Sequence, residues 1–470
     1  MKKVTDCGSA RVLLVSNGIP PKGQWGTEFY THQLACGLQA RGRDVAVFLP
    51  IRDHDAARYS LRRTERHGLD LFELVNCGDP QKSFEDSYQN DGVERAFARV
   101  LEEFRPEVVH FNQLLWGLSI GLPRLAAEAG ARIVNTVTDL GLLCHKGQFF
   151  DSTLSSCGGP SSSSECARCV REPSRFDAEP AELFVRRAAV RGAAKLGGLG
   201  RIVVAKDIER RAKMVREAVT YIDRWVFPTR ALRDEFQSSG LATEGSSVLP
   251  YGIDEEVFKL PRVPDERRGF RFSFFGQFMP HKGLETLFKA VRKMESRLPE
   301  SVSPWSLRCF GHGSLGRHHL YAGRAFELVR GSRRVLDSGC FPPIDAPRVM
   351  AETDVLVVPS IWMENAPLTV LQARAAGVPV IASDVRGVRE VMDPGVHGVL
   401  VPPGDEGALA DAMRAAILAG PTRYAPDPVV TYADHLDQIE TLYGERMEVV
   451  IPARPQETEV GEAAIGSVEV

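Results

Sequence analysis

The chain has 470 residues, of which 43% are hydrophobic and 25% charged, and its formal net charge is -3. This length favours two domains, and the composition is that of an ordinary globular protein. A charge this close to zero gives no general attraction for nucleic acid, and no apolar run reaches the roughly 18 residues of a spanning helix. The first residues lack the pattern of a signal peptide. We therefore expect a cytoplasmic protein that does not bind nucleic acid.

The first half of the chain alternates short apolar runs with helical segments. The apolar runs lie at residues 11–16, 44–49, 107–111, 132–136 and 224–227. A helix is expected over residues 28–41, where Gly42 would end it. Short strands that alternate with helices predict a parallel, doubly wound sheet. We assign residues 1–255 to this first, Rossmann-like domain.

A second series of the same kind follows a segment rich in proline and charge, residues 256–269, which we expect to be a linker. Its apolar runs lie at residues 271–275, 307–310, 355–358 and 378–382. They predict a second Rossmann-like domain over residues 270–425, so that two α/β domains face a central cleft where ligands bind. We expect residues 426–448 to form a helix that crosses back to the first domain. The polar, acidic residues 449–470 are expected to be disordered.

The most informative pattern lies near residue 364. An apolar strand is followed by a short loop with Glu364 and Asn365, and then by a helix that begins near Pro367. In an α/β domain this order presents the backbone N–H groups of the helix start to a phosphate. A carboxylate just before that helix can then bind the sugar-like end of the same ligand.

A glycine and a lysine upstream strengthen this interpretation. Gly276 follows an apolar strand, and Lys282 and Gly283 begin the next helix. Glycine allows close approach of the backbone, and lysine supplies a point charge for a diphosphate. Taken alone, the pair favours a solvated lysine at a helix start. Together with the pattern near Glu364, it predicts a sugar-nucleotide site.

In order and spacing, these motifs resemble the C-terminal domain of the retaining glycosyltransferases of family 4, which have the two-domain GT-B fold. The resemblance extends over about residues 11–447 and is most specific in the second half. Further similar segments are residues 311–313, 354–360, 375–383 and 386–390, and in the first half residues 23–28, 108–110, 136–139 and 248–254.

The resemblance implies a role for each matching position. Lys282 would neutralise the donor diphosphate, Glu364 would contact hydroxyls of the transferred sugar, and Gln372 would lie by the ribose. The resemblance implies catalytic roles for Glu364, Lys282 and Asp139. The donor-binding residues that it implies are Gly26, Gly276, Gln277, Gly283, Gly339, Phe341, Asn365, Pro367, Leu368, Thr369, Gln372 and Arg386. No cofactor is expected to be required for catalysis.

The chain departs from the family pattern at three positions. Gln372 replaces the second of two glutamates, Gln277 replaces an arginine, and Thr138 replaces a histidine. A neutral glutamine forms weaker hydrogen bonds than a charged side chain. We hypothesise that Arg386 supplies the cation that is missing at position 277.

These features predict a retaining glycosyltransferase that moves a sugar from a UDP- or GDP-linked donor to a glycan or lipid-linked acceptor. Such an activity would serve polysaccharide or glycoconjugate assembly. The three departures keep an alternative open, a GT-B protein that binds a nucleotide, a sugar or a partner without turnover. Another enzyme on the same fold, such as a sugar-nucleotide epimerase or a phosphorylase, is a further alternative.

Four cysteines cluster in a loop rich in glycine and serine, residues 144–169. They are Cys144, Cys157, Cys166 and Cys169, separated by 12, 8 and 2 residues. A final Cys-x-x-Cys with two further cysteines nearby is typical of a structural zinc site. Free thiols in a flexible loop are the alternative, and an iron–sulfur cluster is a third interpretation.

Residues 171–216 are rich in arginine and lysine, with apolar residues between them. A basic amphipathic face of this kind can dock on anionic lipid at the inner face of a membrane, where a lipid-linked acceptor would be found. A solvated helix face, partly balanced by glutamates in the segment, is the alternative.

Overall fold

The protein is described from a computed structural model of the whole chain. The structure describes residues 10–21, 23, 25–77, 84–153, 155–160, 162–172, 182, 184–185, 188, 203–241, 245–260, 269–298, 304–311 and 318–444. The predicted tail, most of the predicted linker and much of the basic segment 171–216 lie outside these residues. In the described part of the chain, no helix has the length and apolar character needed to cross a membrane.

The described residues of the first half form an eight-stranded sheet in the order β3-β4-β2-β1-β5-β6-β7-β8. Neighbouring strands run parallel, except for β3 and β4, which are antiparallel. The strands are β1 (Arg11–Val15), β2 (Asp44–Ile51), β3 (Leu61–Arg66), β4 (Leu69–Val75), β5 (Val108–Phe111), β6 (Arg132–Thr136), β7 (Arg224–Phe227) and β8 (Ser246–Val248). The predicted parallel sheet is therefore confirmed, with an unpredicted hairpin at one edge.

The sequence of β1 shows why the sheet is covered on both faces. Side chains alternate between the two faces of a strand, and β1 is apolar at four consecutive positions. Val12 and Leu14 belong to a core with residues of α1 (Gly26–Ala40), whereas Leu13 and Val15 belong to a core with residues of α2 (Asp91–Phe104). Burial on both faces is what a doubly wound fold requires.

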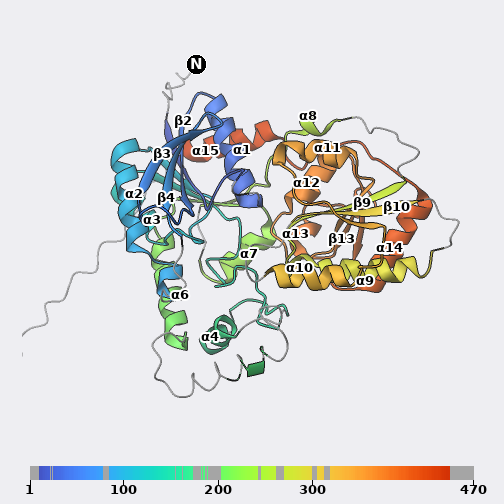
Figure 1. Cartoon of the computed structure of the whole chain (residues 1–470). Coiled ribbons are helices and arrows are strands. Elements are labelled where there is room, and N and C mark those ends of the chain that lie inside the picture. The colour runs from blue at the N-terminus through green and yellow to red at the C-terminus, as the bar shows by residue number, and fades with distance from the viewer. Residues whose placement is uncertain are drawn as a thin grey trace, which may run out of the picture.

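The second half forms a six-stranded sheet in the order β11-β10-β9-β12-β13-β14, and its neighbouring strands are parallel. The strands are β9 (Phe270–Phe275), β10 (Trp305–Phe310), β11 (Val335–Asp337), β12 (Val355–Val358), β13 (Val380–Ser383) and β14 (Gly398–Val401). Two α/β lobes thus stand side by side (Figure 1), and the predicted GT-B class is confirmed.

Helices cover both sheets (Figure 1). The helices of the first half, in addition to α1 and α2, are α3 (Leu122–Glu128), α4 (Ser163–Arg171), α6 (Ala205–Val219), α7 (Arg230–Ser238) and α8 (Glu255–Phe258). Those of the second half are α9 (Leu284–Glu295), α10 (His318–Glu327), α11 (Ala346–Ala351), α12 (Leu368–Ala375), α13 (Arg386–Arg389), α14 (Glu406–Ala419) and α15 (Tyr432–Gly444). Short 3-10 turns are η1 (Glu85–Ser87), η2 (Pro280–Lys282) and η3 (Pro343–Asp345).

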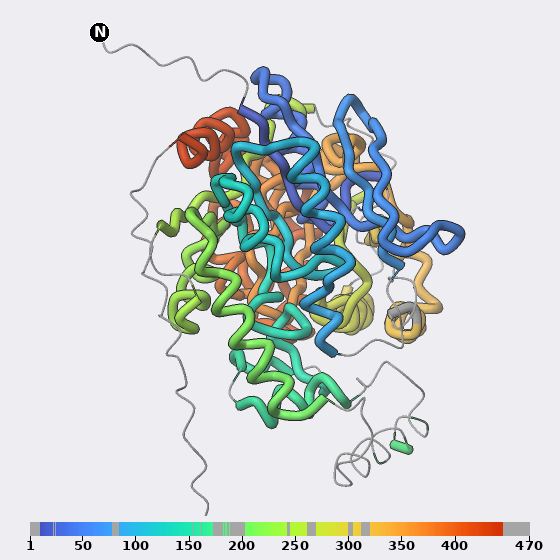
Figure 2. Tube along the Cα trace, turned by 90° about the vertical axis from the view of Figure 1, so that its left-hand side faces the viewer, coloured from blue at the N-terminus to red at the C-terminus, as the bar shows by residue number. Residues whose placement is uncertain are grey.

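Helices α4 and α6 lie together at one end of the N-terminal lobe in both views (Figure 1 and Figure 2).

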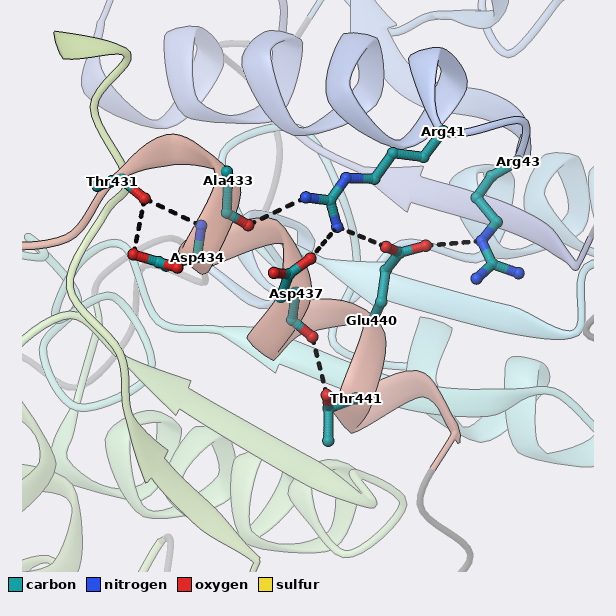
Figure 3. A network of polar contacts seen from close by, with 8 residues as sticks. All are labelled: Arg41, Arg43, Thr431, Ala433, Asp434, Asp437, Glu440 and Thr441. Atoms are coloured by element: carbon teal, nitrogen blue, oxygen red, sulfur yellow. Dashed lines mark hydrogen bonds and ion pairs between the residues drawn. The ribbon is translucent and has the colours of Figure 1, made fainter. Parts of the chain in front are cut away.

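Helix α15 returns to the N-terminal lobe and lies beside α1 (Figure 1). Arg41, just after α1, donates to Asp437 at 2.6 Å and to Glu440 at 2.7 Å, and Arg43 donates to Glu440 at 2.7 Å (Figure 3). Buried His435 lies 2.9 Å from the carbonyl oxygen of Pro250 through its Nδ1. Helix α15, the last described helix, therefore connects the end of the C-terminal lobe to the N-terminal lobe.

Candidate functional site

A cleft of about 570 Å³ lies between the lobes. The loops that line it follow strands β1, β5 and β6 of the first sheet and β9, β10, β11 and β12 of the second. All these strands contribute their carboxyl ends, which is where open α/β sheets bind ligands. Below, the residues of the first half that line the cleft are called the N-terminal wall, and those of the second half the C-terminal wall.

A partly buried ion pair forms the base of the C-terminal wall. Lys282 Nζ donates to both carboxylate oxygens of Glu364, at 2.7 and 3.0 Å, and Ser360 Oγ donates to Oε1 at 2.5 Å. Lys282 Nζ also lies 5.0 Å from the ring centroid of Trp362. Only 3% of Glu364 is exposed, and its φ of 48° is in the left-handed region, which a non-glycine residue adopts at an energetic cost. Such backbone strain is typical of functional sites.

The start of α12 lies directly beside this pair. Pro367 is the N-cap residue of α12 and supplies no side-chain hydrogen bond to the helix start. The first N–H groups of a helix have no partner within the helix, and the helix dipole favours an anion there. Pro367, Leu368, Thr369 and Gln372 all line the cleft. This helix start is therefore suited to hold a phosphate next to the Lys282 side chain.

Three phenylalanine rings gather at another part of the C-terminal wall. The ring centroids of Phe275, Phe310 and Phe341 lie 5.2 to 5.5 Å from one another, and all three residues line the cleft. Aromatic faces of this kind provide apolar surface for a flat ring such as a nucleobase. Of these, the sequence predicted Phe341, whereas Phe275 and Phe310 were missed because they were assigned only as the last residues of two apolar strands.

Asp139 is held rigidly on the N-terminal wall. Its Oδ2 accepts hydrogen bonds from Trp116 Nε1 at 2.7 Å and from Gln113 Nε2 at 2.9 Å. Its Oδ1 accepts the backbone N–H of Gly141 at 2.7 Å. The preceding carbonyl, of Thr138, accepts from Asn365 Nδ2 at 2.6 Å, so the two walls are joined at this point.

Glu28 is a buried carboxyl group on the same wall. Its Oε1 accepts from Asn17 Nδ2 at 3.0 Å, whereas its buried Oε2 has no hydrogen-bond partner among the described residues. Burial raises the pKa of Glu28 to about 7. Hydrogen bonds from the backbone of Glu28 itself, from Asn17 and from the backbone of Trp25 oppose this increase, and the charge of Asp139 adds to it. Glu28 was not among the residues predicted from the sequence, although its place in the first turn of α1, after a glycine loop, was a signal.

Most of the predicted donor residues do line the cleft. They are Gly26, Gly276, Gln277, Lys282, Phe341, Glu364, Asn365, Pro367, Leu368, Thr369 and Gln372, with Asp139 on the opposite wall. A Cβ built on Gly26 would lie 3.5 Å from Leu368 Cδ1, so the starts of α1 and α12 face each other. The structure therefore brings together residues that are far apart in the sequence.

Gly283 and Gly339 do not line the cleft. Gly283 has a φ of 74°, and a Cβ there would collide with the carbonyl oxygen of Pro359, so this glycine is required for backbone packing. Gly339 has a φ of 64°, and its carbonyl oxygen accepts the N–H of Gly311 at 2.8 Å. These glycines shape the loops behind the site, and their contact with a donor stays a prediction.

Arg386 is also outside the cleft lining, and the hypothesis that it supplies the missing cation is not supported. Its guanidinium pairs with Glu235 of α7, in the other lobe. Glu390, which follows α13, accepts the backbone N–H of Arg230 at 2.6 Å, at the start of α7. The segment that contains Arg386 therefore holds the lobes together, because α13 packs against α7.

The four cysteines of the predicted zinc site line one cavity of about 400 Å³ beneath the N-terminal wall. Burial raises the pKa of the Cys166 thiol to about 11, and it also raises the pKa values of Cys157 and Cys169. Among the described residues, no group of three or more histidine, cysteine or acidic side chains is placed to hold a metal ion. As arranged, the cysteines do not fit a zinc ion, and the predicted zinc site is not supported.

Comparisons with known proteins agree with this geometry. The family described as "Glycosyl transferase 4-like domain" matches residues 26–252, and the family described as "Glycosyl transferases group 1" matches residues 269–418. A phosphatidyl-myo-inositol mannosyltransferase of Mycobacterium leprae is 33% identical over 189 residues, which are 40% of this chain and 48% of the relative. A D-inositol 3-phosphate glycosyltransferase of Geodermatophilus obscurus is 30% identical over 237 residues, 46% of this chain and 50% of the relative.

These matches span about half the length of the curated relatives. Among solved structures, Anabaena HepE in complex with UDP and glucose matches with a TM-score of 0.59 and 16% identity. That match covers 92% of this chain and 99% of the Anabaena chain. At 16% identity, this similarity concerns the fold alone, and it extends over both lobes.

Proposed function

The chain belongs to the family-4 glycosyltransferases of the GT-B fold, and from this premise we propose that it transfers a sugar from a nucleotide-diphosphate sugar to a glycan or lipid-linked acceptor, with retention of the anomeric configuration. Such an activity would act in polysaccharide or glycoconjugate assembly. The observation that carries the proposal is the Lys282–Glu364 pair beside the start of α12.

In the proposed complex, the donor diphosphate lies at the start of α12. The N–H groups of Leu368 and Thr369 and the ammonium group of Lys282 bind its oxygens. Glu364 then contacts hydroxyls of the donor sugar, Gln372 lies by the ribose, and the phenylalanine cluster that includes Phe341 holds the base. The order of these groups along the C-terminal wall supports a nucleoside diphosphate sugar. We propose UDP or GDP as its nucleotide.

The proposed reaction needs no protein nucleophile. The bond between the anomeric carbon and the diphosphate oxygen breaks, and both electrons leave with the diphosphate. The acceptor oxygen bonds to the anomeric carbon on the face that the diphosphate leaves, and the acceptor proton passes to a phosphate oxygen. Lys282 and the α12 start stabilise the negative charge that develops on the diphosphate, which is positioning and electrostatic catalysis. No metal or other cofactor has a step in this proposal.

Gln277 lines the cleft where the family pattern has an arginine, so the site holds one cation fewer than that pattern. This observation sustains the binding-only protein as the second candidate function. Donor hydrolysis without an acceptor separates the two. We expect slow release of sugar from one of UDP-glucose, UDP-galactose and GDP-mannose, whereas a binding-only protein would release none.

Proton NMR of the released sugar tests the stereochemistry in the same experiment. From an α-linked donor, a retaining enzyme releases the α anomer first, before mutarotation. First appearance of the β anomer would contradict retention. The names of the two relatives given above include inositol. D-inositol 3-phosphate therefore belongs among the first acceptors to be tested, beside simple glycosides.

A further inference from the structure

The indole of Trp116 is exposed in the cleft, and the proposed donor complex assigns it no contact. Trp116 is 46% exposed, follows β5 and lines the N-terminal wall. Trp362, on the C-terminal wall, is 9% exposed and is covered by Lys282 and His281. Removing a large aromatic side chain from water lowers the free energy. An exposed indole within a cleft is therefore a candidate binding surface.

The orientation of Trp116 is fixed from several sides. Its φ of 57° is in the left-handed region, which a non-glycine residue adopts at an energetic cost. Its Nε1–H donates to Asp139 at 2.7 Å, and Asp139 is itself held by Gln113 and the Gly141 N–H. A Cβ built on Gly147 would lie 3.0 Å from Trp116 Cζ2, so this glycine allows the loop to pack against the indole edge. The indole is therefore held in place before any ligand binds.

Polar side chains share the wall of the cleft with the exposed indole. They are Asp139, Gln113, Lys146 and Gln148. A flat aromatic face on a wall that also carries a carboxylate, amides and an ammonium group matches the chemistry of a sugar ring. The C–H groups on one face of a sugar ring pack on the aromatic face, and the hydroxyl groups around its edge form hydrogen bonds.

We propose that Trp116 is the stacking platform for a six-membered polyhydroxy ring of the acceptor, a pyranose or a cyclitol, and that it thereby determines acceptor specificity. This inference rests on the proposed transfer reaction, because it assigns the other substrate of the same cleft. It places the acceptor ring on the N-terminal wall, opposite the C-terminal wall to which we assign the donor.

The test measures ring binding separately from nucleotide binding. Saturation-transfer NMR is recorded with methyl α-D-glucopyranoside, methyl α-D-mannopyranoside, methyl β-D-galactopyranoside and myo-inositol, with and without UDP. We expect at least one of these compounds to bind the wild-type protein, with the strongest transfer to C–H protons on one face of its ring. Trp116→Ala should weaken that binding at least tenfold and leave UDP affinity unchanged.

Two further variants make the result specific. Trp116→Phe keeps an aromatic face but loses the hydrogen bond to Asp139, so it should retain more ring binding than Trp116→Ala. Tyr221→Ala removes another exposed aromatic side chain, 38% exposed and outside the cleft lining, and should match the wild type.

Equal ring binding by Trp116→Ala and wild type would overturn the proposal, as would failure of all four compounds to bind the wild type. Parallel loss of UDP binding in Trp116→Ala would also overturn it, because the platform is assigned to the acceptor alone. Failure of the wild-type protein to bind any nucleotide or sugar nucleotide would instead contradict the proposed function. The two failures are therefore distinguishable.

Discussion

The two walls of the cleft differ in how their polar groups are satisfied. On the C-terminal wall, Glu364 is paired with Lys282 and Ser360. On the N-terminal wall, Glu28 leaves one buried oxygen without a hydrogen bond among the described residues, and Trp116 exposes its indole. Buried polar groups are normally hydrogen-bonded, so unsatisfied ones indicate where another molecule completes the structure. The carboxylate of the proposed donor side is thus organised in advance, whereas that of the opposite side is not. Trp362 Nε1 and Asn365 Oδ1 on the C-terminal wall are also buried without a hydrogen-bond partner among the described residues, so both walls offer polar groups that a ligand can complete.

The largest expected effect comes from Lys282→Ala. This change removes the cation beside the α12 start and leaves Glu364 buried and unpaired. We expect donor turnover to fall about 10²- to 10³-fold, the loss typical of removing one group that stabilises developing charge. Sugar release from the donor measures it.

Lys289→Ala is the matched control for that change. Lys289 lies in α9, beyond the cleft lining, and pairs with Glu285 four residues away at 2.8 Å. Its loss should leave turnover within about twofold, since exposed pairs of this kind contribute little. A similar loss of donor turnover in both variants would show that Lys282 has no special role.

Glu28 gives a pH-dependent prediction for the opposite wall. Its folded pKa of about 7 lies above the ordinary value of 4.5, so the folded state holds the proton more tightly than the unfolded state. The resulting stability is present below pH 4.5 and is lost as the pH rises through about 7. A shift of this size corresponds to about 3 kcal/mol at most.

Glu28→Gln removes that titration and keeps an oxygen for the Asn17 hydrogen bond. Chemical denaturation at pH 5 and pH 8 should therefore show the variant gaining stability relative to the wild type as the pH rises. A difference between the two proteins that does not change with pH would show that Glu28 is ionised throughout this range.

A smaller effect is expected where α15 joins the N-terminal lobe. Arg41 and Glu440 form a hydrogen-bonded pair at 2.7 Å, with side chains 27% and 18% exposed (Figure 3). A double-mutant cycle with Arg41→Ala and Glu440→Ala should give a coupling energy of about 1 kcal/mol in urea denaturation. Zero coupling would mean that this pair does not contribute to holding α15.

The smallest effect is expected at Arg386. Because its guanidinium pairs with Glu235 and lies away from the cleft lining, Arg386→Ala should change UDP affinity by less than twofold. Titration calorimetry measures this. A loss of tenfold or more would restore the hypothesis that Arg386 compensates for Gln277.

The C-terminal wall was predictable because its chemistry is local in the chain. Glu364, Pro367 and Gln372 lie in one strand–loop–helix segment, so their order indicates where the helix start and the carboxylate lie. Trp116 on the N-terminal wall has no such local signal. Trp116 meets Asp139 and Gly147 only after two strands and their loops have packed, and pattern rules do not extend over that separation.

The fold shows a related difference between elements that the sequence predicts and elements that it does not. Buried strands such as β6 and β12 are short apolar runs, and their predicted positions agree with the structure. The β3–β4 hairpin was missed because β3 is an exposed edge strand with charged residues at most positions. Its turn is formed by His67 and Gly68, both with positive φ, as two-residue hairpin turns require.

The most direct test of the account is calorimetric titration of UDP and uridine, with GDP and guanosine as a second pair, into wild type and Lys282→Ala. We predict that one diphosphate binds the wild type at least 100-fold more tightly than its nucleoside. In Lys282→Ala this ratio should fall at least tenfold, with nucleoside affinity unchanged. Equal binding of the diphosphate by both proteins would contradict the assignment of Lys282 and the start of α12 as the diphosphate site.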